Sequence, residues 1–199
     1  MVSSPRAIYG GKATLSFSVM LKTAATLLLI YWFWIYRIQL ALQERRVYLS
    51  LVSDGMAQTH CSLPWLGNKA QIPNLRHHIQ GIYAHGRTAY FYRHFHNINN
   101  TANVQIHTLL LTLENLLKDV KEKDNMNQLP PTLFFQVDGG SENVAKVVFF
   151  VCELLVATGV LKKIVLSRLM VGHTHCDIDA LFGRIWVYCR VIFSFRLKI

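Results

Sequence analysis

The sequence has few charged residues, and it lacks the cysteine pattern of small disulfide-bonded domains. Only 16% of its 199 residues are charged, whereas 52% are hydrophobic. The four cysteines form no CxxC pair, which argues against a disulfide framework and favours a reducing intracellular compartment such as the nucleus. Internal repeats and low-complexity segments are absent, and the length fits one domain with a substantial core.

Acidic residues are scarce. The chain has 11 Asp and Glu against 21 Lys and Arg, which gives a formal net charge of +10 and a pI near 9.7. This balance is compatible with an ordinary basic surface. It also favours a polyanionic partner, of which nucleic acid is the commonest.

Near the N-terminus, residues 23–36 carry no charge at all. A membrane-spanning helix needs roughly 20 apolar residues, and this stretch is shorter unless 38–42 extend it. Association with a membrane is therefore one alternative. The other is a helix that contacts a partner or an interface through residues 23–42. Every face of such a helix is apolar, so we expect it to project from the core with its aromatic side chains exposed.

The periodic segments follow the order β-β-β-α-β-α-β-α after this first helix. Expected strands are 47–53, 78–84, 88–95, 132–137 and 161–169; expected helices are 23–46, 101–123, 141–158 and 174–191. Short turns join the first three strands, which should be antiparallel, and the last two strands follow helices and should run parallel to the first.

This order predicts an α/β protein with a ribonuclease-H-like mixed five-stranded sheet, helices on both faces and an extra N-terminal apolar helix. The expected organisation is an extension over 1–46, the domain over 47–190 and a tail over 191–199.

Carboxylates mark the ends of the buried elements. Asp54 follows the first expected strand and Asp138 the fourth, and these strands should be neighbours, so the two side chains should meet at one edge of the sheet. Asp177 and Asp179 stand at the start of the last helix. Hard oxygen ligands of this kind suit Mg²⁺ and phosphoryl transfer.

Three segments carry a resemblance to a known family. Residues 53–58 (SDGMAQ, with Leu63-Pro64 following), 136–143 (QVDGGSEN) and 172–182 (GHTHCDIDALF) resemble the DGM-x-Q…LP, Q-x-D…EN and GHTH-x-DID-x-x-F motifs of a transposon-derived domain of unknown function. That family looks like a ribonuclease-H-like integrase. The resemblance covers about residues 47–186.

What the resemblance implies is a DDE/D-type nuclease or transposase with two Mg²⁺ or Mn²⁺ ions. Asp54 and Asp138 would bridge the ions, and Asp177 is preferred as the third ligand because it is nearer the helix start. Asp179 is then a catalytic candidate or a partner of the helix dipole. His175 would stabilise the transition state or hold its loop, and a zinc site with Cys176 is an alternative.

Four further residues are candidates for DNA contact: Arg87, Arg93, Asn143 and Lys146. Their alternative is an ordinary solvated surface. The chain departs from the family pattern at Ala57, where an acid is common, and it has no zinc finger or helix-turn-helix module.

The leading hypothesis is a transposon-derived, metal-dependent DNA nuclease or strand-transferase-like domain, with truncation of the domain left open. One alternative is a catalytically inactive remnant that binds nucleic acid or has kept no activity. A second is a small membrane-anchored protein.

Overall fold

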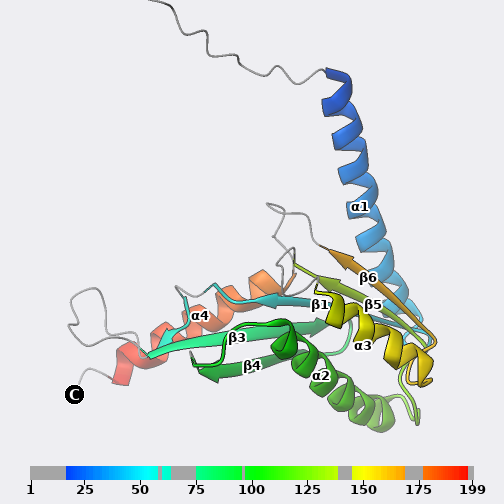
Figure 1. The fold of residues 1–199 in the computed structure, drawn as a ribbon. Coiled ribbons are helices and arrows are strands. Elements are labelled where there is room, and N and C mark those ends of the chain that lie inside the picture. Colours follow the sequence, from blue (N-terminus) through cyan, green and yellow to red (C-terminus); the bar gives the residue numbers. More distant parts are fainter. Residues whose placement is uncertain are drawn as a thin grey trace, which may run out of the picture. The chain divides into compact units, whose positions relative to one another are not determined.

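The computed structural model describes residues 17–57, 60–63, 75–95, 97–138, 145–168 and 177–196 (Figure 1). The chain divides into two compact units between Tyr36 and Arg37. The first contains most of a long helix, and the second contains the sheet and the remaining helices.

The elements follow the predicted order, with one short strand added. They are α1 (Phe17–Gln43), β1 (Tyr48–Gly55), β2 (Ser62–Leu63), β3 (Leu75–Ala84), β4 (Ala89–Phe95), α2 (Ala102–Lys123), β5 (Thr132–Val137), α3 (Lys146–Ala157), β6 (Lys163–Arg168) and α4 (Asp177–Arg196).

The main strands lie in the order β4-β3-β1-β5-β6. β1 and β4 pair antiparallel with β3, whereas β5 is parallel to both β1 and β6. The fold class predicted from the sequence, a ribonuclease-H-like mixed α/β sheet, is therefore confirmed. β2 was not predicted, because its two residues leave no periodic signal; it pairs with β3 at Leu75 and Arg76, beyond the end of β1.

One face of the sheet forms the main hydrophobic core. Alternate side chains of β1, β3 and β5 point to this face, and α2 covers it with a stripe of leucines at helical spacing. The cluster comprises Leu49, Leu51, Ile82, Ala84, Leu109, Leu113, Leu116, Leu129, Leu133, Phe135, Val137 and Leu161. Burying each large side chain contributes about 1.5–3 kcal/mol, so this layer supplies most of the stability.

The opposite face is covered by α4. Ile178 and Phe182 are buried and pack on Gly81 of β3, where an added Cβ would be 2.8 Å from the Phe182 ring and 2.9 Å from Ile178 Cδ1. The absence of a side chain at Gly81 thus allows the helix to approach the sheet closely. Helices lie on both faces, as predicted (Figure 1).

The last turns of α1 belong to the sheet-containing unit. Arg37 and Ala41 are buried, and the Arg37 guanidinium donates a 2.7 Å hydrogen bond to Ser167 Oγ and lies 5.4 Å from the Phe134 ring centroid. The division at Tyr36 therefore precedes the predicted boundary at residue 46. At the other end, α4 continues to Arg196, into the predicted tail.

Within the first unit, four aromatic residues of α1 are exposed, whereas Trp34 is half-buried: Tyr31, Trp32, Phe33 and Tyr36 retain 42–65% of their accessible surface. Among the described residues, no helix has the length and apolar character needed to cross a membrane. The predicted membrane-anchored alternative is thus not supported.

Candidate functional site

Asp54 and Asp138 stand at corresponding positions at one edge of the sheet. β1 and β5 are parallel, and Ser53 lies in register with Val137, so each aspartate comes directly after a paired residue. Asp54 is also opposite Gly81 in the antiparallel pair, and directly opposite residues point to the same face. That face is the one that α4 covers.

The Asp54 carboxylate is nearly buried, with 8% of the residue exposed. Its pKa is raised to about 6, chiefly by burial; the charges of Asp138 and Asp179 add to the rise, and the 2.8 Å hydrogen bond that the Gly55 amide donates to Oδ1 opposes it. The three aspartates therefore form one acidic cluster contributed by β1, the end of β5 and the first turn of α4.

Asp177 lies in different surroundings. Its Oδ2 is 3.5 Å from Nε2 of His85, a buried residue in the turn after β3. Burial lowers the pKa of His85, and the Asp177 charge opposes that effect. The sequence favoured Asp177 over Asp179 as the third ligand, whereas the structure places Asp179 among the charges that act on Asp54.

The second ring nitrogen of His85, Nδ1, is 2.9 Å from Ser50 Oγ. The sequence Ser50, His85, Asp177 has the residue types of a hydrolase triad, but Ser50 is inside β1 and only 5% exposed. Because no substrate can reach such a hydroxyl, the arrangement does not supply a nucleophile; it places His85 between β1 and the start of α4.

A buried polar network lies behind Asp54, on the core face. Gln80 Nε2 donates to Ser53 Oγ and to Gln105 Oε1, both at 2.9 Å, and Gln105 Nε2 donates to Ser53 Oγ at 3.0 Å. These bonds fix the end of β1 to β3 and to the first turns of α2. Sequence reasoning missed Gln80 and Gln105; a glutamine inside an otherwise apolar strand or helix stripe is the signal that would have found them.

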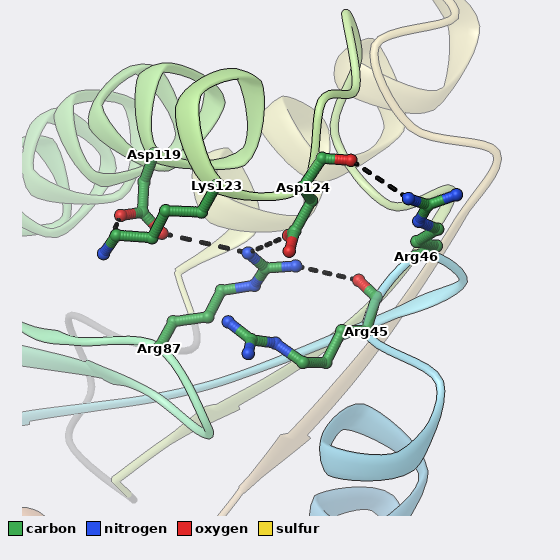
Figure 2. A network of polar contacts seen from close by, with 6 residues as sticks. All are labelled: Arg45, Arg46, Arg87, Asp119, Lys123 and Asp124. Carbon is green, nitrogen blue, oxygen red and sulfur yellow. Dashed lines mark hydrogen bonds and ion pairs between the residues drawn. The ribbon is translucent and has the colours of Figure 1, made fainter.

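Arg87, a predicted DNA contact, is instead buried in an ionic network (Figure 2). Its side chain is 2% exposed, donates at 2.6 Å to Asp124 Oδ2 and at 2.8 Å to the Arg45 carbonyl, and lies 3.8 Å from Asp119. A guanidinium held in this way is not available to a phosphate. Arg87 lies in the turn between two strands, a position that predicts exposure. The sequence does not show that the end of α2 lies beside this turn.

The other candidates are distributed along the fold. Arg93 is exposed on β4, and Lys146 is exposed at the first residue of α3. Asn143 and His175 lie outside the described residues. Within the described part of the chain, no three His, Cys, Asp or Glu side chains are gathered closely enough to hold a metal ion. The oxygen donors of Asp54, Asp138 and Asp179 are of the hard type that divalent cations such as Mg²⁺ prefer.

The order and directions of the strands define an α/β protein of ribonuclease-H-like topology. The chain belongs to the family described as a domain of unknown function (DUF7869), whose sequence profile matches residues 68–190. Asp138, Asp177 and Asp179 fall inside the matched range, and Asp54 precedes it.

Among solved structures, the chain is similar to one titled "Crystal structure of the Mos1 Strand Transfer Complex", with 11% sequence identity and a TM-score of 0.39. The match covers 82% of this chain and 53% of that one, so the chain spans about half the length of the protein it matches. Similarity at this level adds nothing to the argument from topology. No curated protein matches the sequence.

Proposed function

We propose that this chain is a metal-dependent DNA nuclease or strand-transferase-like domain of transposon origin. The observation that carries the proposal is the acidic cluster: Asp54 and Asp138 end adjacent parallel strands, and Asp54 has a pKa near 6 partly because Asp138 and Asp179 are close. Like charges held close together at the carboxyl end of a sheet repel one another, and a bound cation would offset that repulsion.

Mg²⁺ or Mn²⁺ is the proposed cofactor, with Asp54, Asp138 and Asp179 as its ligands. Such an ion, when bound, would neutralise the charge of a phosphodiester and would lower the pKa of the attacking water. The chain's own part is positioning. The Ser53–Gln80–Gln105 network holds the Asp54 backbone, and the His85–Asp177 contact holds the start of α4, which carries Asp179.

The main test is nicking of supercoiled DNA with Mg²⁺ or Mn²⁺. Asp138→Asn should reduce the rate by at least about 100-fold, since it removes a ligand while keeping the size of the side chain. Glu122→Gln, an equivalent change on the exposed surface of α2, is the matched control and should have no effect. Equal activity of wild type and Asp138→Asn would refute the proposal.

The two aspartates of α4 can be separated in the same assay. Asp179→Asn should resemble Asp138→Asn, whereas Asp177→Asn should retain more activity because its carboxylate contacts His85. The reverse order would restore Asp177 as the third ligand. A readout independent of cleavage is thermal unfolding: millimolar Mg²⁺ should raise the Tm of the wild type more than that of Asp138→Asn.

The second candidate function is nucleic-acid binding without cleavage. The formal net charge of +10 supports it, because a basic protein binds polyanions whether or not it is an enzyme. A wild-type protein that binds DNA but shows no metal-dependent nicking would establish this candidate in place of the first.

A further inference from the structure

A long stretch of the sequence contains no negative charge. After Asp54, the next acidic residue is Glu114, and the residues between them include four Lys or Arg and seven of the nine histidines. β2, β3 and β4 lie entirely within this stretch. One edge of the sheet is therefore built only from neutral and basic residues, which suits a polyanion.

β4 forms that edge, and its outward side chains follow a simple alternation. Phe91, Arg93 and Phe95 lie opposite Gly81, Ile79 and His77 of β3, and therefore point to the face that α4 covers. Phe91 is 39% exposed, Phe95 is 53% exposed, and Arg93 between them is exposed as well.

Contacts with neighbouring rings hold these side chains in place. The Arg93 guanidinium lies 5.5 Å from the centroid of the Phe95 ring, and that ring is 5.6 Å from His77. On the other side, Phe91 contacts Phe182 of α4, with ring centroids 5.9 Å apart. Two oriented aromatic rings with a cation between them are thus presented on a rigid strand.

From this arrangement we propose that the β4 edge, formed by Phe91, Arg93 and Phe95, binds an unpaired DNA strand by stacking its bases. Aromatic side chains stack on bases of any sequence, and an adjacent arginine binds the phosphate between them. A duplex cannot use such a surface, because its base faces are already stacked inside the helix. The choice of DNA over RNA rests on the proposed function; the preference for an unpaired strand rests on β4 alone.

The test is fluorescence anisotropy of the full chain in EDTA, with labelled oligothymidine and a duplex of the same length as probes. The wild type should bind oligothymidine more tightly than the duplex. Phe95→Ala should weaken oligothymidine binding by about 10-fold or more and change duplex binding by less than about twofold. Phe150→Ala removes an aromatic residue of α3 that is 61% exposed, slightly more than Phe95, and is the matched control, with no expected effect.

Arg93→Ala should weaken binding of both probes and reduce the dependence of log K on log salt by about 0.7 for the single strand. All three variants should keep the wild-type Tm, because each removed side chain is exposed. The proposal is overturned if the duplex binds as tightly as oligothymidine, or if Phe95→Ala behaves like Phe150→Ala.

This experiment is independent of cleavage. The acidic site is at the ends of β1 and β5, and β5 is separated from the edge strand β4 by β3 and β1. A wild type that binds oligothymidine as expected but shows no metal-dependent nicking would refute the proposed catalysis and leave this inference standing. Metal-dependent nicking by the wild type without a preference for the unpaired strand would refute this inference and leave the proposed catalysis standing.

Discussion

Among the individual residues, Asp54 shows most directly how a candidate site affects stability. Its pKa in the folded chain is raised from 3.8 to about 6, chiefly because the carboxylate is buried. A raised pKa means that the fold is more favourable with the neutral acid. The contribution of this neutral form to the free energy of unfolding is fully present below the unfolded pKa of 3.8. It is lost as the pH rises through the folded pKa of about 6.

Replacing Asp54 with asparagine should therefore stabilise the fold at neutral pH. Asn keeps the acceptor for the Gly55 amide and carries no charge, so the variant should be more stable than the wild type by up to about 3 kcal/mol at pH 7.5. The two proteins should become similar near pH 4. Urea unfolding at the two pH values measures this, and a difference that does not change with pH would contradict the assigned cause.

The sequence predicts the position of a candidate site residue well where that residue follows the end of a strand. Asp54 and Asp138 could be located because each follows a buried strand, and the parallel register then brings them together. Asp177 and Asp179 could not be distinguished in that way. Their surroundings depend on His85, which is distant in the sequence and reaches Asp177 only through the turn after β3.

At the scale of elements, the contact of α4 with β3 depends on a glycine. Gly81→Ala would place a Cβ 2.8 Å from the Phe182 ring and 2.9 Å from Ile178, both of which are buried. We expect a loss of about 1–3 kcal/mol from overpacking. The free energy of unfolding from urea titration measures this loss.

The same substitution within α4 is the control. Gly183 has no atom within 4 Å of an added Cβ, so Gly183→Ala should stabilise the helix by about 0.5–1 kcal/mol. If Gly81→Ala and Gly183→Ala changed the free energy of unfolding in the same direction, the close packing of α4 on Gly81 would not explain the effect of Gly81→Ala.

A second element-level prediction concerns the ionic network in Figure 2, which joins the turn after β3 to the end of α2 and to the segment before β1. Arg87→Ala would leave the nearly buried Asp119 and Asp124 without their shared cation, and should cost about 3 kcal/mol. Lys118→Ala, which removes an exposed pair with Glu114, should leave thermal stability nearly unchanged. Similar Tm values for the two variants would show that the network contributes little.

Element types and order followed from the sequence, because hydrophobic periodicity differs between strands and helices. Boundaries followed less closely: β3 begins at Leu75 rather than 78, and the predicted start of the last helix at 174 lies outside the described residues. The first part of β3 is stabilised by pairing with β2, whose two residues show no pattern of their own. Such boundaries depend on partners distant in sequence, which local periodicity does not report.

At the scale of the whole molecule, the division at Tyr36 leads to a pair of truncations. Removing residues 1–36 should leave the Tm of the remaining protein unchanged. Removing 1–42 also deletes Arg37 and Ala41, both buried, and the hydrogen bond to Ser167, so it should cost about 2 kcal/mol. Equal Tm values for the two truncated proteins would place the boundary after residue 42 instead.

The parallel pairing of β1 with β5 has a consequence for the order of folding. β1 meets β3 within about 30 residues of chain, whereas Leu51 pairs with Phe135, 84 residues further on. Closing the longer loop costs more entropy, so the β1–β3–β4 meander should form early and the junction with β5 late. Asp54 and Asp138 then approach each other only at that late step. Their mutual repulsion arises after the meander has formed, and it should accelerate unfolding of the completed domain more than it slows folding.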